Sequence, residues 1–265
     1  MEMTDRAPYP DLPFKIRWKL WRQDALAALG VNNHRRVRIK AHPLGAEIIV
    51  DDGRIIVPSP YRWKLYRKGW AARLDQLAAE YGVGRHVTLN ADSVVIDIGA
   101  NAGEFAHICA RYGARVWCLE PDATVRACLV ENIAALPNAT AHDALLWKEE
   151  TQIAFASIPA HADSSVFAEN TATTTRAATT LDTFCAEHEI ENIDLIKCDA
   201  EGAEPEVLEG AGIMLARTRA VAIDTGAERR GARTHETCRA ILEAAGFRVI
   251  DEAVGKRLMT YGLRA

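Results

Sequence analysis

The amino-acid sequence has no run of about 18 apolar residues, so we expect no membrane-spanning helix. Residues 1–13 are polar and rich in proline and contain no apolar signal core, which favours a cytoplasmic location over secretion. The six cysteines form no C-x-x-C pair and no Cys/His zinc spacing. We therefore expect buried thiols in a reducing compartment, with neither disulfides nor structural zinc.

The composition fits one large α/β domain, or one domain with an appendage. The chain has 265 residues, of which 49% are hydrophobic and 26% charged, and this argues against a disordered or fibrous protein. Residues 1–90 hold 16 Lys and Arg against 9 Asp and Glu, whereas residues 91–265 hold 16 against 27. We predict a basic N-terminal extension over residues 1–90 and an acidic main domain over residues 91–265.

The extension is predicted to contain two helices and a hairpin. Residues 14–29 place apolar side chains at helical spacing, with Lys and Arg largely on other faces. The preferred interpretation is a helix packed on the domain, and the alternative is contact with an anionic membrane or a partner. Two β-branched runs flank Asp51-Asp52-Gly53 and predict the hairpin, and residues 61–81 predict the second helix. The apolar positions of the first helix are Phe14, Trp18, Trp21, Ala25 and Leu29.

Predicted strands and helices alternate regularly in the main domain. Residues 93–99, SVVIDIG, are typical of a buried parallel strand, and the alternation predicts a doubly wound, mostly parallel α/β sheet. Residues 247–254 and 257–265 flank a Gly255-Lys256 turn and predict a terminal hairpin that adds one antiparallel strand. Further strands are expected at 114–120, 139–146, 192–199 and 219–226, an extra edge strand at 151–157, helices at 102–112, 123–135, 180–190, 204–215 and 234–246, and a loop at 158–179.

The turn after the first of these strands, residues 97–103 (DIGANAG), has the character of a nucleotide-binding loop. Gly99 permits a tight turn and a close backbone approach, and Gly103 lets the helix and strand pack closely. Asn101 stands where a middle glycine is common, and asparagine tolerates left-handed geometry better than most residues. Because the loop is not a strict G-x-G-x-x-G, it is a weak signal by itself.

Acidic residues at the strand ends make the signal more specific. Glu120 ends the second strand 21 positions after Gly99, where a carboxylate accepts hydrogen bonds from the ribose hydroxyls of an adenosine. Asp97 either fixes the loop or faces a positive part of the cofactor, and Asp143 either meets an adenine edge or is a solvated carboxylate. Such a site repels a pyrophosphate and suits S-adenosylmethionine, which carries a sulfonium and an ammonium and no phosphate.

Residues 193–211, IDLIKCDAEGAEPEVLEGA, carry a second group of candidate site residues. Strand alternation delivers Lys197 and Asp199 to the crevice beside the cofactor loop, and the turn then presents Glu201. These groups would bind a cation such as Mg²⁺, orient the amino group of the cofactor or activate a substrate hydroxyl. Glu204 opens the next helix, where it contacts substrate or only complements the helix dipole.

Four ordered segments within residues 92–250 resemble FkbM-type methyltransferases. They are the signature at 193–211 and the shorter segments 95–101, 118–122 and 179–182. The resemblance implies a class I methyltransferase fold, S-adenosylmethionine as methyl donor and, in most members, O-methylation of a sugar, glycolipid or polyketide-like product. Carried across, it implies that Asp97, Gly99, Asn101 and Glu120 hold the cofactor, and the further cofactor candidates are Ala100, Gly103, Pro121 and Asp143.

The same resemblance places Asp199, Glu201 and Lys197 at the reacting centre. For the base that takes the proton of an acceptor hydroxyl, Asp199 is the first candidate, Glu201 the second and His161 a further one. The strand after the signature often ends in a Val-Glu pair in this family, but here it reads AIDTG over residues 222–226, which leaves the acceptor open. The candidate substrate contacts are Ser164, Ser165, Glu204, Asp224 and Arg229.

The expected partner is a small-molecule or glycan acceptor. No nucleic-acid module is visible, and a homo-oligomer is left open. One alternative function is a nicotinamide-dependent oxidoreductase, against which the terminal hairpin and the lack of a Tyr-x-x-x-Lys pair count. The other is a non-catalytic member that binds the cofactor or a partner.

Overall fold

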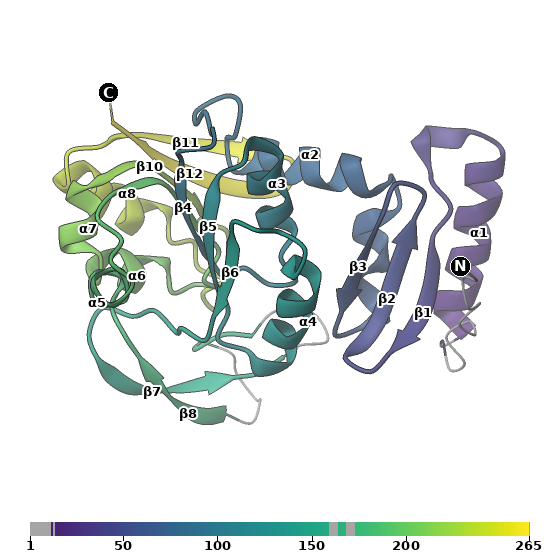
Figure 1. The fold of residues 1–265 in the computed structure, drawn as a ribbon, viewed down its shortest axis with the longest axis horizontal. Coiled ribbons are helices and arrows are strands. Elements are labelled where there is room, and N and C mark those ends of the chain that lie inside the picture. Colours follow the sequence, from purple (N-terminus) through teal and green to yellow (C-terminus); the bar gives the residue numbers. More distant parts are fainter. Residues whose placement is uncertain (1–11, 13, 159–163, 168–172, 265) are drawn as a thin grey trace.

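Seven strands form one sheet in the larger part of the molecule (Figure 1). The computed structural model describes residue 12 and residues 14–158, 164–167 and 173–264. Across the sheet the strands follow the order β11-β12-β10-β9-β4-β5-β6. Their bounds are Arg248–Val254 (β11), Arg257–Leu263 (β12), Thr218–Asp224 (β10), Ile193–Cys198 (β9), Val94–Ile98 (β4), Arg115–Leu119 (β5) and Ala139–His142 (β6).

All strands of this sheet except β12 run in the same direction. β4 pairs in parallel with β5 and β9, β9 with β10, and β5 with β6. β12 pairs antiparallel with both of its neighbours, β10 and β11. The α/β fold with a terminal antiparallel hairpin, expected from the sequence, is therefore confirmed.

The central strands are buried on both faces. Val95 and Leu195 belong to one core, and their chain neighbours Ile96 and Ile196 belong to the other, as the two-residue period of a strand requires. Helices α2, α3 and α4 contribute to the first core, and α5, α6, α7 and α8 to the second. The helices are α2 (Trp70–Glu80), α3 (Glu104–Tyr112), α4 (Ala123–Ile133), α5 (Leu181–Glu187), α6 (Glu204–Glu209), α7 (Gly212–Ala216) and α8 (His235–Ala244).

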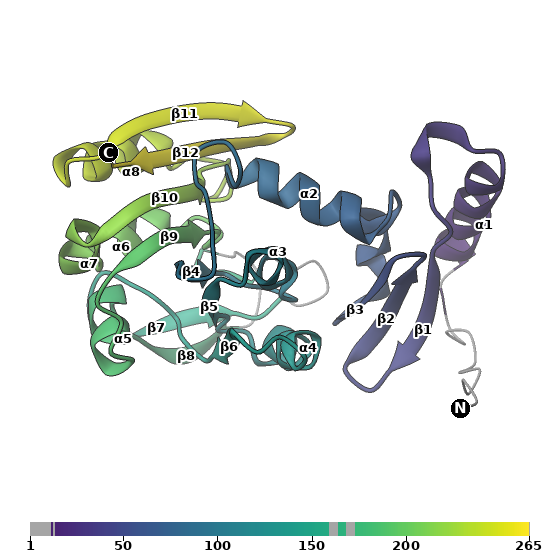
Figure 2. The same cartoon turned by 45° about the horizontal axis from the view of Figure 1, so that its top comes forward.

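A smaller antiparallel sheet lies at the other end of the molecule (Figure 2). Its strands are β1 (Arg38–His42), β2 (Gly45–Val50) and β3 (Gly53–Val57), and β1 was not expected from the sequence. Residues from this sheet, α1 (Phe14–Ala28) and the 3₁₀ helix η2 (Pro60–Tyr66) form a core of their own. By contrast, Leu74 and Leu77 of α2 pack into the larger core, so the extension is tied to the main domain through α2.

Two helices expected to be continuous are each divided in the structure. Residues 61–81 form η2 and α2, and residues 204–215 fall into α6 and α7. Asp52 accepts hydrogen bonds from the backbone N–H groups of the first turn of α2, at 2.8 and 2.9 Å. Asp182 caps α7 in the same way at 2.8 Å. The predictions were wrong because a remote carboxylate stabilises a second helix start inside each apolar period.

The expected edge strand at 151–157 and the expected loop at 158–179 are also corrected. β7 (Thr151–Ala156) pairs with β8 (Thr173–Ala178) in a separate two-stranded antiparallel sheet. Residues 173–178 therefore form a strand, because the β-branched threonines of TTTRAA fit a strand that has found a partner.

Helix α1 is confirmed, but it packs by a face that the sequence did not predict. Ile16 and Gln23 are its buried residues, and Gln23 Nε2 donates to two backbone carbonyls at 2.7 and 2.8 Å. The aromatic positions expected to pack are exposed instead. Of the helices in the described part of the chain, none is both long and apolar enough to cross a membrane.

Candidate active site

A cavity of about 1000 Å³, counting its mouth, opens at the carboxyl ends of β4, β5 and β9. This is the edge at which open α/β sheets bind ligands. Its polar lining includes Arg62, Arg73, Tyr81, Asn101, Glu104, Glu120, Ser164, Ser165, Lys197, Asp199, Glu201 and Arg257. Its apolar lining includes Leu77, Phe105, Pro121, Val125, Leu145, Phe155 and Val166.

The loop after β4 adopts the geometry that its glycine and asparagine predict. Gly99 has φ +69°, and a Cβ there would lie 1.9 Å from the carbonyl oxygen of Asp199. Only glycine therefore allows the β4 loop and the β9 loop to touch at this point. Asn101 is left-handed at φ 52°, and its side chain accepts hydrogen bonds from Arg62 and from the N–H of Ala102.

Glu120 lies between this loop and the cavity. Its two carboxylate oxygens accept hydrogen bonds from the N–H of Asn101 at 3.0 Å and the N–H of Asp122 at 2.9 Å. Only 6% of the residue is exposed, and burial raises the pKa of its carboxyl to about 7. The side chain lines the cavity as the sequence predicts for a ribose-binding carboxylate.

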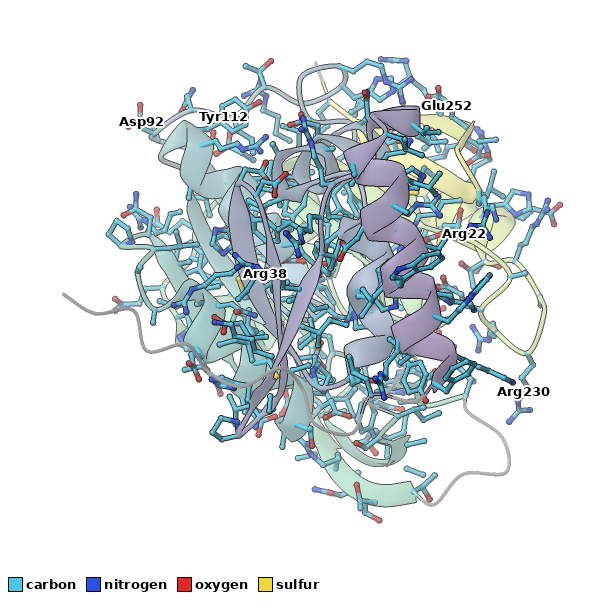
Figure 3. All side chains as sticks on the ribbon, turned by 90° about the vertical axis from the view of Figure 1, so that its right-hand side faces the viewer. Arg22, Arg38, Asp92, Tyr112, Arg230 and Glu252 are labelled. Carbon is cyan, nitrogen blue, oxygen red and sulfur yellow. The ribbon has the colours of Figure 1, made fainter. Side chains whose placement is uncertain are left out.

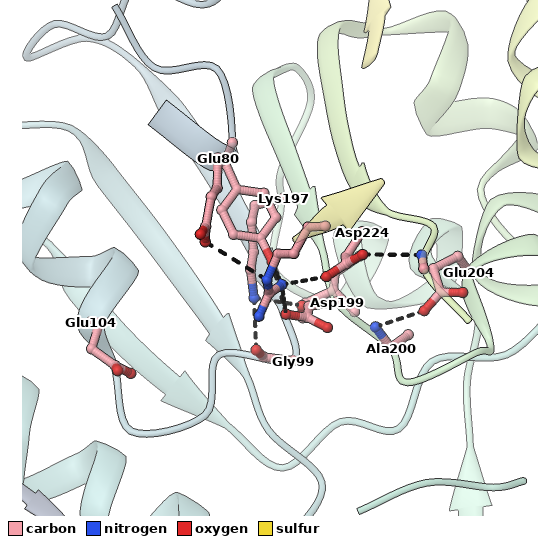
Figure 4. Close-up of polar contacts among 12 residues, drawn as sticks. Glu80, Gly99, Glu104, Lys197, Asp199, Ala200, Glu204 and Asp224 are labelled. Carbon is pink, nitrogen blue, oxygen red and sulfur yellow. Dashed lines mark hydrogen bonds and ion pairs between the residues drawn. The ribbon is translucent and has the colours of Figure 1, made fainter. Parts of the chain in front are cut away.

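Asp97 and Lys197 form a buried ion pair beneath the loop. Lys197 Nζ lies 2.8 Å from Asp97 Oδ1 and donates to the carbonyl of Ile98 at 3.1 Å. It also donates to the carbonyl of Gly99 at 2.7 Å (Figure 4). Asp97 is 0% exposed and does not line the cavity. Burial would lower the pKa of Lys197, but the attraction of Asp97 and Asp199 raises it, so the amine stays protonated. The pair holds the loop, which is the first of the two roles considered for Asp97.

Only one of the two carboxylate oxygens of Asp199 has hydrogen-bond partners among the described residues. Its Oδ2 accepts hydrogen bonds from the hydroxyl of Tyr81 and from Nη1 of Arg257, each at 2.8 Å. Its Oδ1 has no hydrogen-bond partner among the described residues. Burial would raise the pKa of Asp199, but the charges of Arg257 and Lys197 outweigh burial and lower that pKa to about 2. The cavity wall therefore carries a carboxylate that is ionised at every physiological pH.

Two further carboxyl groups surround this centre. One oxygen of each of Asp199, Asp224 and Glu228 lies within 4.8 Å of the others. Burial, with the nearby charge of Asp199, raises the pKa of Asp224 to about 6 and that of Glu228 to about 10. Arg257 Nη1 also donates to Asp224 Oδ2 at 2.5 Å. A divalent cation at this point would compete with the guanidinium, so Arg257 is the cation that the geometry favours.

Of the two glutamates that follow Asp199, Glu201 lines the cavity and Glu204 supports the loop from outside it. Glu201 lines the cavity and has a left-handed backbone at φ 50°. Glu204 is 1% exposed and lies outside the cavity lining, where it accepts from the N–H groups of Ala200 and Gly202 and from the Thr234 hydroxyl. Glu204 therefore stabilises the loop that presents Asp199 and Glu201.

Ser164 and Ser165, the candidate substrate contacts, both line the cavity. Ser164 Oγ donates to Asp122 Oδ2 at 2.8 Å, and Ser165 Oγ donates to the carbonyl of Glu201 at 2.8 Å. These hydrogen bonds hold the 164–167 segment to the start of α4 and to the turn after β9. His161 lies outside the described residues.

Asp143 and Arg229, two other candidates, do not line the cavity. Asp143 forms ion pairs with Arg126 and Arg176, and its side chain is 50% exposed. Arg229 pairs with Glu206 at 2.5 Å and lies over the ring of Phe167 at 4.3 Å. For Asp143 the structure favours the solvated carboxylate over the adenine contact.

Sequence reasoning missed four cationic or hydroxyl groups of the cavity, which are Arg62, Arg73, Tyr81 and Arg257. A topological signal for Arg257 was available. An antiparallel strand begins at the edge where its parallel neighbours end, so the first residue of β12 had to lie beside the carboxyl end of β10. The other three come from the extension, and no local pattern connects them with the cofactor loop.

The sheet order, the loop after β4 and the carboxylate after β5 define a class I, S-adenosylmethionine-dependent methyltransferase. The family model for the FkbM methyltransferase domain matches residues 97–249, and this chain belongs to that family. The resemblance found in the sequence is thereby confirmed. The family also decides against the nicotinamide-dependent oxidoreductase.

Solved structures with a similar arrangement have low sequence identity. Fibrillarin from Aeropyrum pernix, in complex with natively bound S-adenosyl-L-methionine, has 12% identity and a TM-score of 0.48, covering 88% of this chain and 96% of that chain. A SAM-dependent methyltransferase from Aquifex aeolicus has 16% identity, a TM-score of 0.44 and coverage of 77% and 92%. Magnesium protoporphyrin IX methyltransferase from Synechocystis PCC 6803, with bound SAM, has 14% identity and a TM-score of 0.43, covering 78% of this chain and 85% of that chain. A search of curated proteins finds no match.

The residues of the cavity fit this cofactor. Glu120 is placed to accept hydrogen bonds from the ribose hydroxyls, and the apolar side chains of Val125, Leu145 and Phe155 suit an adenine ring. The close approach at Gly99 keeps that part of the wall free of side chains. When bound, S-adenosylmethionine supplies an electrophilic methyl group on a sulfonium.

We expect the affinity for S-adenosylmethionine to fall with decreasing pH between pH 7 and pH 5. Ribose hydroxyls donate to the ionised form of Glu120, whose pKa is about 7, so each unit below that pH weakens binding by up to about tenfold. Calorimetric titration of the wild type and of Glu120→Gln at several pH values measures the affinity for S-adenosylmethionine. The variant should bind weakly, and its affinity should depend little on pH.

Glu204→Gln is the matched control for this pH dependence. Burial also raises the pKa of Glu204 to about 7, but this carboxyl lies outside the cavity lining. The control should keep the pH dependence of the wild type. A pH-independent wild-type affinity would contradict a ribose contact by an ionised Glu120.

Proposed function

We propose that this protein transfers the methyl group of S-adenosylmethionine to a hydroxyl oxygen of a sugar, a glycolipid or polysaccharide, or a secondary metabolite. The proposal is supported mainly by the hydrogen bonding of Asp199, in which only one carboxylate oxygen has partners. Its Oδ2 is occupied by Tyr81 and Arg257, while its Oδ1 has no hydrogen-bond partner in the described part of the chain. Asp199 lines the cavity, and its buried, unpartnered oxygen would accept the hydrogen of a hydroxyl group that reaches it.

The reaction is an in-line displacement in which the acceptor oxygen bonds to the methyl carbon as the carbon–sulfur bond breaks. Asp199 Oδ1 accepts the hydroxyl hydrogen and thereby orients an oxygen lone pair toward the carbon. A carboxylate with a pKa of about 2 is a weak base toward a neutral alcohol. Once the oxygen carries the methyl group it is a strong acid, so Asp199 takes the proton late in the reaction.

Arg257 and Tyr81 act as positioning residues in this mechanism. Arg257 keeps Asp199 ionised, and the two donors occupy Oδ2, so Oδ1 is the oxygen left for the acceptor. Lys197, which the sequence placed at the reacting centre, stays protonated and holds the cofactor loop. Glu201 lines the cavity and is the second candidate for contact with the acceptor.

The alternative that deserves a test is a non-catalytic member that binds only the cofactor. Purified protein is incubated with methyl-labelled S-adenosylmethionine and four kinds of acceptor: monosaccharides, nucleotide sugars, glycolipids and hydroxylated polyketides. We expect label in a product that survives mild base, because a methyl ether resists the hydrolysis that removes a methyl ester. Cofactor binding without transfer to any acceptor would favour the non-catalytic protein, and base-labile label would indicate methylation of a carboxylate.

A further inference from the structure

Helix α1 carries an aromatic face that is largely exposed in the described structure. It lies at the end of the molecule farthest from the seven-stranded sheet, and Figure 3 looks onto that end. Phe14, Trp18 and Trp21 are 78%, 49% and 68% exposed. Their spacing of four and three residues puts the three rings on one face of the helix.

The aromatic face is opposite to the face that packs. Ile16 and Gln23 are buried, and Leu20 packs against the small core. Two residues of α-helix turn through about 200°, so Trp18 lies almost diametrically across the helix from Ile16. The exposure of the rings is therefore set by how α1 docks on the small sheet.

Positive charge surrounds the aromatic face. Lys15, Lys19 and Arg22 flank it on one side and Arg17 on the other, and all four are exposed. Residues 14–69 carry 13 Lys and Arg and only four Asp and Glu. The side chains of Arg22 and Arg38 project from this end of the molecule in Figure 3.

We propose that α1 binds this protein to an anionic phospholipid surface. The three rings would lie at the boundary between the head groups and the acyl chains, where Trp and other aromatic side chains are favoured. The flanking Lys and Arg side chains would reach the lipid phosphates with their charged ends. We choose a membrane as the partner because α1 presents both an exposed apolar face and dense positive charge. An anionic bilayer is complementary to both. The proposal does not depend on the acceptor of the methyl group.

The test is co-sedimentation of the full chain with lipid vesicles at low ionic strength. Phosphatidylcholine vesicles containing about one third phosphatidylglycerol should bind the protein, and vesicles of phosphatidylcholine alone should bind it far less. The variant F14S/W18S/W21S should lose at least about tenfold in partitioning. The variant K15Q/K19Q/R22Q should lose about a hundredfold on anionic vesicles.

The matched control removes apolar surface elsewhere. Val130 and Ile213 are 52% and 62% exposed, and V130S/I213S should partition like the wild type. Affinity for S-adenosylmethionine, unchanged in all three variants, would show that they fold. Equal binding to neutral and anionic vesicles, or binding that survives the triple aromatic substitution, would overturn the proposal. The proposal would also be overturned if the wild type did not bind vesicles and the variant F14S/W18S/W21S formed smaller oligomers than the wild type. The aromatic face would then join copies of the chain.

Discussion

Asp199→Asn should lower the rate of methyl transfer by about a hundredfold to a thousandfold at saturating cofactor. The single amide oxygen would face Arg257 and Tyr81, which both donate to it, so the NH2 group would replace Oδ1 and could not accept the hydrogen of the acceptor hydroxyl. The amide also cannot take a proton or carry the negative charge that balances the oxonium formed on the acceptor. Single-turnover kinetics with labelled S-adenosylmethionine measure the chemical step, and calorimetry should give a cofactor affinity within about threefold of wild type.

Asp143→Asn is the control for this substitution. Asp143 also follows a parallel strand and pairs with arginine, through Arg126 Nη2 at 2.8 Å, but it lies outside the cavity lining. Its transfer rate should match the wild type. If Asp199→Asn kept more than about a tenth of the rate, Asp199 would not be the base, and Glu201 would be the next residue to test.

Lys197→Met should destabilise the protein by about 3–5 kcal/mol, because it leaves the carboxylate of Asp97 buried without its cation. Asp97 is 0% exposed, and the side chain of Lys197 is 6% exposed. The loop after β4 also loses the two hydrogen bonds that Lys197 donates to its carbonyls. Urea unfolding measures the free energy of unfolding, and the affinity for S-adenosylmethionine should fall together with it.

Two further variants separate the buried charge from other effects. D97N/K197M removes both charges and should recover part of the loss, since no ionised group is left buried. Arg126→Met breaks a pair of the same 2.8 Å length that is more exposed to solvent, so it should cost less than about 1 kcal/mol. A loss below about 1 kcal/mol for Lys197→Met would show that water reaches Asp97 or that Asp97 is protonated in the folded protein.

The order of strands and helices in the main domain could be predicted from the sequence. Apolar runs such as SVVIDIG and the Gly-Lys turn near the C-terminus are local patterns, and the sheet follows from them. The errors fall where partners are remote: Asp52 starts α2 inside an apparently continuous helix, and β7 makes residues 173–178 a strand. Periodicity also failed in α1, where Gln23 is buried and donates to the carbonyls of Arg35 and Arg67, whereas the tryptophans are exposed.

The sequence by itself determined the family, the cofactor loop and the edge of the sheet at which the site lies, because these depend on residues within a few positions of one another. Only the tertiary structure decided what each strand-end carboxylate does. Asp97 and Asp199 both stand at the carboxyl ends of neighbouring parallel strands, yet Lys197 neutralises the first, whereas Arg257 keeps the second ionised and occupies only one of its oxygens. Those cations come from segments about 100 and 58 residues away, and electrostatic pairing depends on distance in space, which local sequence patterns do not record.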